Sequence, residues 1–261
     1  MSESTRVKIE IERGLHVLTL ARPEKRNAFD LRMLGELAEG LTAYEDDTDA
    51  RCAVLLAEGD HFTAGLDLAE VGPAVRAGAA LFPDGGVDPL NLHGRRRKKP
   101  LVMAVQGWCL TIGIELLLAA DVRIAAEGSR FGQIEINRGI FPFGGATVRL
   151  PQVAGWANAM RWLLTGDIFD AAEAERIGLV SDVVAPAELR AHALQIARTI
   201  ARRAPLGVQA TLASAETTLR EGPDAAAEKL LEQARALMET EDAAEGLRSF
   251  VERREAEFTG K

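Results

Sequence analysis

Short apolar runs alternate with longer segments of helical periodicity between residues 17 and 184. Five runs have the length and the residue types of buried strands, at 17–20, 52–57, 101–105, 122–126 and 179–184. The segment 30–44 places leucines on one helical stripe, and further helices are predicted from about Asp67 and over 112–120. Because strands and helices alternate, the sequence predicts an α/β fold with mainly parallel strands and right-handed crossovers.

The last part of the chain has a different pattern. From about Pro186 to Lys261 it is helical, rich in alanine and glutamate, and contains no convincing strand. Pro205 and the stretch 221–223 interrupt the periodicity and are expected to separate helices. The pattern therefore predicts a strand-containing core at 1–200 and a helical C-terminal region at 201–261.

The segment 72–94 is rich in glycine and proline. A segment of this length is often functional, and it could form a mobile loop or short helices beside a pocket. The segment could equally be a variable surface loop with no function of its own.

Composition excludes several classes of protein. With 47% hydrophobic residues the chain of 261 residues can bury a large core, and its net charge of −8 argues against general binding to nucleic acid or anionic membranes. Cys52 and Cys109 form no CxxC pair and no metal spacing with a histidine, so neither a disulfide framework nor a metal site is expected. No signal sequence or membrane span is recognisable, which favours a cytoplasmic protein. The basic run 95–99 is more typical of a solvated helix end than of a phosphate or nucleic-acid site.

Two glutamates lie inside apolar stretches, Glu115 in Gly113–Leu116 and Glu135 in Phe131–Ile136. A buried carboxylate is costly unless it is paired or protonated. If both faced one pocket, their pKa values would be pushed apart, which would leave one acid and one base near neutral pH. Such a pair could add or remove water or a proton. Each glutamate could equally be a satisfied helix or loop residue.

Two strand-to-helix turns could supply backbone donors. Gly65 permits a tight turn, Asp67 is placed to cap the next helix through its side chain, and the N–H of Leu66 would remain free. The N–H of Ile112 would lie in the first turn of a helix, where amides have no intrahelical partner. Two such donors could hold a carbonyl oxygen that becomes an oxyanion, with Glu115 on the same helical face as Ile112. Taken singly, each turn is more typical of a purely structural connection between a strand and a helix.

Five motifs follow one another along the chain. They are Ala-Arg-Pro-Glu-Lys-Arg-Asn-Ala-Phe (21–29), Phe-Thr-Ala-Gly-Leu-Asp-Leu (62–68), Gly-Ile-Glu-Leu-Leu-Leu-Ala-Ala-Asp (113–121), Phe-Gly-Gln-Ile-Glu-Ile (131–136) and Leu-Thr-Gly-Asp (164–167). In this order they resemble the enoyl-CoA hydratase/isomerase, or crotonase, superfamily over essentially the whole chain. Glu115 and Glu135 match both glutamates of the family's hydratases, whereas many members with other reactions lack one.

The resemblance implies a crotonase-like spiral of ββα units with the acyl-CoA site at 1–200, and a helical trimerisation region at 201–261 that forms a homotrimer or a dimer of trimers. It implies an acyl-CoA thioester substrate whose carbonyl oxygen lies between the N–H groups of Leu66 and Ile112, with no cofactor besides the substrate's own coenzyme A and no metal. Glu115 would activate water and Glu135 would supply a proton, as members of one coupled pair. The residues implied near the substrate and its coenzyme A are Lys25, Arg26, Ala28, Ala64, Gly65, Asp67, Leu68, Gly113 and Phe143.

Two departures from the family pattern predict a reshaped acyl pocket. Thr111-Ile112-Gly113 stands where typical hydratases have three glycines, and Phe143 replaces a glycine whose N–H helps to hold the catalytic water. The favoured function is enoyl-CoA hydratase. An enoyl-CoA isomerase or a specialised acyl-CoA dehydratase of the same fold remains an alternative. So does a non-enzymatic scaffold that binds CoA or RNA, although a scaffold has no need for two buried carboxylates.

Overall fold

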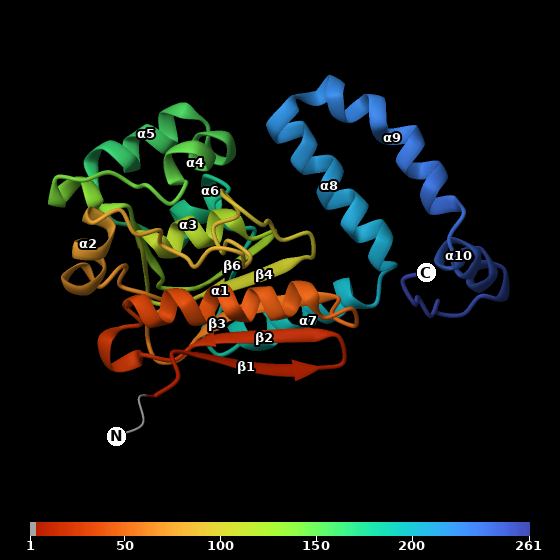
Figure 1. Ribbon diagram of the computed structural model, residues 1–261, viewed down its shortest axis with the longest axis horizontal. Helices are drawn as coiled ribbons and strands as arrows, with labels where there is room; N and C mark the ends of the chain where they lie inside the picture. Colours follow the sequence, from red (N-terminus) through yellow and green to blue (C-terminus); the bar gives the residue numbers. More distant parts are fainter. Residues whose placement is uncertain (1–3) are drawn as a thin grey trace.

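The computed structural model describes residues 4–261, and its centre is a six-stranded sheet with the order β1-β2-β3-β4-β6-β9 (Figure 1). The strands are β1 (Val7–Glu12), β2 (Leu15–Leu20), β3 (Cys52–Ala57), β4 (Leu101–Val105), β6 (Val122–Ala126) and β9 (Asp182–Val184). β1 pairs antiparallel with β2, and every other neighbouring pair in this sheet is parallel. The predicted α/β fold with mainly parallel strands is therefore confirmed, although β9 is shorter than the predicted run 179–184.

The side chains of β2, β3 and β4 are buried on both faces of the sheet, where successive residues of a strand point to opposite sides. Leu55 of β3 belongs to a core that includes Leu34 and Leu37 of α1 (Leu31–Asp46). Val54 belongs to a second core on the other face, which includes Ala193 of α7 (Leu189–Ala201). The two helices thus cover opposite faces, and this explains why the strands read as uninterrupted apolar runs. The predicted helix at 30–44 is confirmed in α1, where the side chain of Asp30 accepts a hydrogen bond from Met33 N at 2.8 Å.

A second, three-stranded sheet has the order β5-β7-β8. It consists of β5 (Trp108–Leu110), β7 (Arg130–Gly132) and β8 (Phe169–Asp170). β5 leads directly into α3 (Ile112–Ala119), and β7 leads into the short 3-10 helix η2 (Ile134–Arg138). Because β5 and β7 pair in parallel, with Leu110 opposite Gly132, the beginnings of α3 and η2 lie side by side.

The remaining elements of the core are η1 (Pro23–Lys25), α2 (Leu68–Arg76), α4 (Ala146–Ala154), α5 (Trp156–Thr165) and α6 (Ala171–Arg176). The capping role predicted for the side chain of Asp67 is wrong, since it makes no capping hydrogen bond to α2 in the part of the chain described. Arg22 draws this carboxylate away, with its Nη1 donating to Asp67 Oδ2 at 3.2 Å.

The C-terminal helices are α8 (Pro205–Glu221), α9 (Pro223–Met238) and α10 (Glu241–Glu252). Figure 1 shows them in blue, standing to one side of the sheets. The predicted helix breaks at Pro205 and at 221–223 are confirmed, and Gly222 separates α8 from α9 with a φ of 92°. The chain end returns to the core, where Arg51 Nη2 donates to the carbonyl oxygen of Thr259 at 3.0 Å. The division of the chain at residue 200 stays a prediction. None of the helices within residues 4–261 combines the length and the apolar character that a membrane span requires.

Candidate active site

A cavity of about 200 Å³ lies where α3, η2 and the turn before α2 meet. Seven residues singled out from the sequence line it, namely Ala64, Leu66, Leu68, Ile112, Glu115, Glu135 and Phe143. The two glutamates, separated by twenty positions in sequence, therefore face one space. Leu81 of the glycine-rich segment 72–94 also lines the cavity, so this segment does lie beside a pocket.

Glu115 belongs to a helix whose residues are all buried, and its own exposure is 5%. Its Oε1 accepts hydrogen bonds from the backbone N–H of Gly144 at 2.6 Å and of Ala146 at 3.4 Å. Burial raises the pKa of Glu115 to about 7, against the lowering effect of these two amides and of the charge on Arg149. This carboxyl group can therefore gain or lose a proton near neutral pH.

Gly144 has to be a glycine in this arrangement. A Cβ atom at this position would lie 2.2 Å from Glu115 Oε2 and 2.6 Å from Glu115 Cδ. The sequence predicts a role for the backbone N–H of Phe143 in this loop, whereas in the structure the N–H of Gly144 contacts the carboxylate. The Gly144-Gly145 pair after Phe143 indicates that the backbone approaches another group closely here. The pair does not indicate which side chain that group belongs to.

Glu135 lies in η2 with 8% of its surface exposed. Burial raises its pKa to about 7, the negative charge of Glu115 adds to this rise, and its own backbone N–H opposes it. When the amide of Gln133 is oriented with its nitrogen toward the carboxylate, that nitrogen lies 3.0 Å from Oε1 and 3.1 Å from Oε2. Gln133 is also buried, so it is a neighbour of the carboxylate that the sequence analysis missed.

The two predicted backbone donors, Leu66 N–H and Ile112 N–H, are both at the cavity wall. Within residues 4–261, neither donates a hydrogen bond to another group of the protein. The turn that presents Leu66 depends on Gly65, which has a φ of 105° and whose added Cβ would lie 2.4 Å from Thr111 Oγ1. Thr111 itself has φ 50° and ψ −114°, a conformation that costs most residues free energy. Two free donors thus face the cavity that holds the carboxylates.

The other predicted site residues are spread around this cavity. Arg26 and Ala64 line a neighbouring cavity of about 350 Å³, which also reaches Trp108 and Arg138. Lys25, Ala28, Gly65, Asp67 and Gly113 are not among the described residues of either cavity wall. The backbone of Gly113 packs on the core instead, where an added Cβ would lie 2.6 Å from Thr63 Cγ2 and 3.0 Å from Cys109 Sγ.

Asn27 organises the loop that carries Lys25, Arg26 and Ala28, and the sequence analysis missed it. It is fully buried with a φ of 51°. Its Nδ2 donates to the carbonyl oxygens of Glu58 at 2.9 Å and His61 at 2.8 Å, and its Oδ1 accepts from Arg22 N at 2.8 Å. The two bonds from Nδ2 connect this loop to the segment that follows β3, and the bond from Arg22 N holds the loop itself together.

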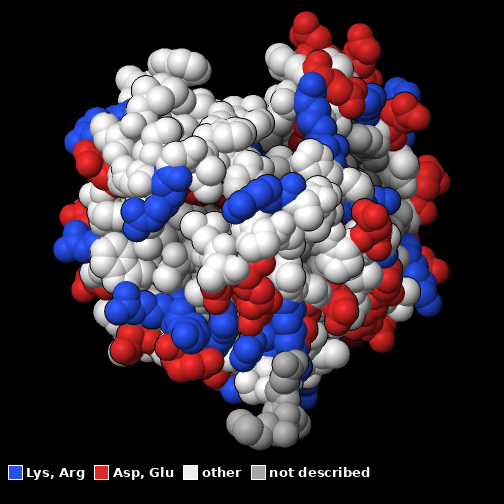
Figure 2. All heavy atoms as spheres, turned by 60° about the vertical axis from the view of Figure 1, so that its left-hand side comes forward, with Lys and Arg blue, Asp and Glu red and all other residues white. Residues whose placement is uncertain are grey.

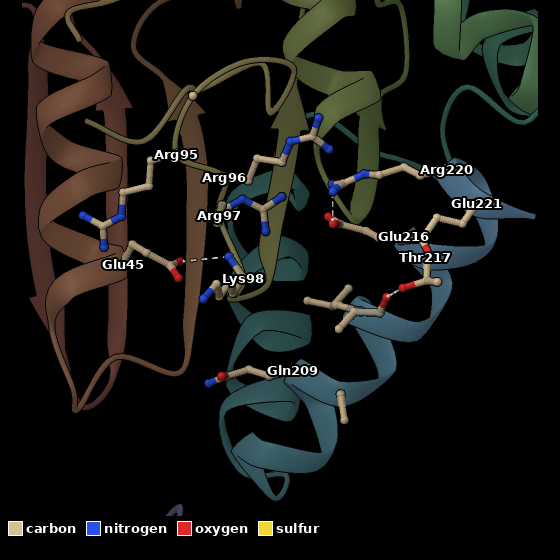
Figure 3. Close-up of a pocket in the computed structure, with 14 residues that line it drawn as sticks. Glu45, Arg95, Arg96, Arg97, Lys98, Gln209, Glu216, Thr217, Arg220 and Glu221 are labelled. Atoms are coloured by element: carbon tan, nitrogen blue, oxygen red, sulfur yellow. Dashed lines mark hydrogen bonds and ion pairs between the residues drawn. The ribbon is translucent and has the colours of Figure 1, made fainter. Parts of the chain in front are cut away.

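The basic run 95–99 differs from the expectation of a solvated helix end. It belongs to an extended segment, and Arg97 is buried with its guanidinium bound to Asp121 at 2.7 Å and to the carbonyl oxygens of Ala119 and Lys99. Figure 3 shows Arg96 extending toward Arg220 of α8 and Arg95 pointing away from it, at a cavity of about 690 Å³ that Lys98, Glu45 and Glu216 also line.

Figure 2 shows acidic and basic side chains intermingled on one face of the molecule. Arg97 and Lys99 support the fold, because both are buried and hydrogen-bonded to backbone carbonyl oxygens, whereas Arg95, Arg96 and Lys98 line the cavity.

Comparison with known proteins agrees with this geometry. The enoyl-CoA hydratase/isomerase family model matches residues 10–261. A crystal structure of a probable enoyl-CoA hydratase/isomerase from Mycobacterium abscessus is 54% identical, with a TM-score of 0.95 over 98% of this chain and 99% of that one, which confirms the crotonase-like fold.

Two curated relatives carry more specific names. A 2,3-dehydroadipyl-CoA hydratase of Escherichia coli is 38% identical over 94% of this chain and 95% of its own length. A crotonyl-CoA hydratase of Syntrophomonas wolfei is 35% identical over 97% of both chains. The chain belongs to the enoyl-CoA hydratase/isomerase family.

Proposed function

We propose that this protein is an enoyl-CoA hydratase, which adds water across the 2,3 double bond of an enoyl-CoA thioester. One observation carries the proposal. Glu115 and Glu135 line the same cavity, and burial raises the pKa of each to about 7. At neutral pH such a pair can hold one proton between them, as the combined addition of a proton and a hydroxyl group requires.

The backbone donors complete the mechanism. The thioester carbonyl oxygen would accept hydrogen bonds from Leu66 N–H and Ile112 N–H, which stabilise the negative charge that develops on it as an enolate forms. An ionised Glu115 would remove a proton from water as the water oxygen bonds to C3. A protonated Glu135 would deliver its proton to C2. Water is thereby split between two carbons, and the pair ends with the same number of protons.

We propose that the cavity beside Arg26 and Ala64 receives part of the coenzyme A arm, which belongs to the substrate, so that no separate cofactor takes part. The combination of a cationic side chain with an apolar one suits an arm that carries phosphates at one end and a hydrocarbon stem at the other.

We further propose a cytoplasmic homotrimer or dimer of trimers that uses the C-terminal helices. Large apolar side chains on these helices are exposed to solvent in the single chain, including Leu231 at 70%, Met238 at 73%, Leu247 at 68% and Phe250 at 81%. Apolar groups exposed in such number are typical of a surface that another subunit covers. Light scattering of the purified protein would measure the assembly, and a monomer at micromolar concentration would contradict this part of the proposal.

The central test is turnover across a panel of enoyl-CoA and 3-hydroxyacyl-CoA thioesters, with analysis of product stereochemistry. We expect hydration that requires both Glu115 and Glu135. If only one of the two is needed, or if the double bond moves without addition of water, the isomerase alternative gains. Absence of turnover with every thioester, despite binding, would contradict the proposed hydratase activity.

A further inference from the structure

Arg138 brings a positive charge to the wall of the cavity that holds the two glutamates. It is the last residue of η2, three positions after Glu135, and its side chain is largely exposed. Most of the described wall is apolar, formed by Ala64, Leu66, Leu68, Leu81, Ile112, Ile134, Ile140 and Phe143, and Arg138 is its single basic residue. This cation would attract an anionic group that enters the cavity.

The guanidinium of Arg138 is not engaged by the protein's own acids. Within residues 4–261 no carboxylate oxygen lies within 4.0 Å of it, and its one hydrogen bond is a long contact of 3.5 Å from Nη1 to the carbonyl oxygen of Asn137. Other arginines of the core are bound at shorter distances, such as Arg97 to Asp121 at 2.7 Å and Arg149 to the carbonyl oxygen of Leu90 at 2.6 Å. Arg138 therefore keeps a planar set of N–H donors, the geometry that binds a carboxylate through two parallel hydrogen bonds.

The proposed hydration mechanism assigns no role to the charge of Arg138. The carbonyl oxygen is assigned to the N–H groups of Leu66 and Ile112, and both proton transfers are assigned to the glutamates. Nor does Arg138 act as the counter-ion of Glu135, because among the described residues no carboxylate oxygen lies within 4.0 Å of its guanidinium and its charge is not among the causes that shift the pKa of Glu135. What remains within reach of the cavity is the acyl group of the substrate.

We propose that Arg138 recognises a carboxylate carried by the acyl group, so that the preferred substrate is the CoA thioester of an unsaturated dicarboxylic acid. This inference rests on the proposed hydratase function and deepens it. A carboxylate on the acyl chain would pair with the guanidinium, while the chain between them would lie along the apolar wall. An acyl group that ends in a methyl would make no ion pair with the guanidinium, so the acidic acyl group is favoured.

Arg138 also lines the neighbouring cavity that we assign to the coenzyme A arm, so the competing role is a contact with a CoA phosphate. The two roles differ in what they predict for paired substrates. A phosphate contact would serve every CoA thioester equally, whereas a carboxylate contact would serve only the acidic acyl group.

The test compares hex-2-enoyl-CoA with the CoA monothioester of hex-2-enedioic acid, which has the same carbon count and a terminal carboxylate. We expect wild-type kcat/KM to favour the acidic substrate by at least ~10-fold, and Arg138→Met to lower its kcat/KM by ~10²-fold while the neutral substrate is affected little, the scale of a lost hydrogen bond to a charged group. Arg138→Lys should recover part of the loss. Arg198→Met, an exposed arginine of α7 that pairs with Glu12, is the matched control and should leave both substrates unchanged.

Two kinetic results would overturn the inference, namely a wild-type preference for the neutral substrate, or an equal loss on both substrates in Arg138→Met, which would assign Arg138 to the coenzyme A arm. If no thioester is hydrated, the hydratase proposal fails on its own. Titration calorimetry of wild type and Arg138→Met with saturated hexanoyl-CoA and the CoA monothioester of adipic acid would then still decide the role of Arg138. Tighter binding of the acidic ligand that disappears in Arg138→Met supports the inference, and equal binding of the two ligands by wild type contradicts it.

Discussion

Replacing either buried glutamate with glutamine should make the protein more stable in alkaline solution while it disables catalysis. Glu115 and Glu135 have pKa values raised to about 7 from the usual 4.5, mainly because burial disfavours their ionised form. A raised pKa contributes stability that is fully present below pH 4.5 and is lost as the pH rises through 7. Glutamine has nearly the same shape, stays neutral throughout and avoids this loss.

The magnitude follows from the two pKa values. Since one pKa unit corresponds to about 1.4 kcal/mol, a rise from 4.5 to about 7 amounts to about 3 kcal/mol of unfolding free energy that disappears above pH 8. The two glutamates do not contribute independently, because the charge on Glu115 itself raises the pKa of Glu135. We therefore expect Glu115→Gln and Glu135→Gln each to gain 1 to 3 kcal/mol, on the order of the single-site value, at pH 8.5.

Urea unfolding at pH 5 and pH 8.5, at one fixed protein concentration, measures this gain. Each variant should match wild type at pH 5 and exceed it at pH 8.5, while hydration falls by at least ~10²-fold. Glu175→Gln, an exchange at an exposed position of α6, is the matched control and should show no gain at pH 8.5. A gain of equal size at both pH values, or a loss of stability at pH 8.5, would refute the reasoning. Near-normal hydration by either variant would exclude the two-carboxylate mechanism.

Four further substitutions test the surroundings of the site. Gly65→Val should abolish turnover and lower the melting temperature, because valine neither tolerates a φ of 105° nor fits beside Thr111; wild-type kinetics would contradict the proposed turn. Gly144→Ala should reduce kcat by at least ~10²-fold, as its methyl group displaces Glu115, and an unchanged pH–rate profile would contradict this role. Asn27→Ala should cost about 2 to 4 kcal/mol in urea unfolding, because its buried hydrogen bonds are lost, and a cost below about 0.5 kcal/mol would argue against it. Phe143→Gly should lower kcat/KM for a short enoyl-CoA and raise tolerance of a long one, whereas equal loss on both would show that the ring only packs.

The sequence predicted the elements whose pattern is local. β3, β4 and β6 are apolar runs because both faces of their sheet are covered, and α1 displays its leucines at helical spacing. Glu115 and Glu135 each stood out as a charge among apolar residues, but their placement at one cavity could be predicted only through the resemblance to the hydratases. β5, β7 and β8 could not, because strands of two or three residues carry too little pattern to distinguish them from a turn.

Partners that are distant in sequence were beyond prediction for a different reason. Nothing local to Arg97 says that Asp121 neutralises it, so a run of five basic residues looked like a solvated surface. Likewise, Gly144 lies 29 positions from the carboxylate that its amide holds. The capping role expected of Asp67 is wrong, and its Oδ2 instead accepts a hydrogen bond from Arg22, 45 positions away. In each case the tertiary structure determines which of several chemically suitable groups makes the contact.

Burial raises the pKa of Glu115, and the hydrogen bond from the amide of Gly144 lowers it. The proton exchange proposed for this carboxyl group depends on both effects. On a helix whose eight residues are all buried, a carboxyl group without a donor would remain protonated well above neutral pH and could not act as a base. A carboxyl group with the same donor at an exposed position would stay ionised and could not act as an acid. The hydrogen bond of 2.6 Å from Gly144 offsets part of the cost of burial, so that the pKa stays at about 7. The closeness of the α4 loop to α3, and not the glutamate alone, therefore allows this group to exchange a proton at neutral pH.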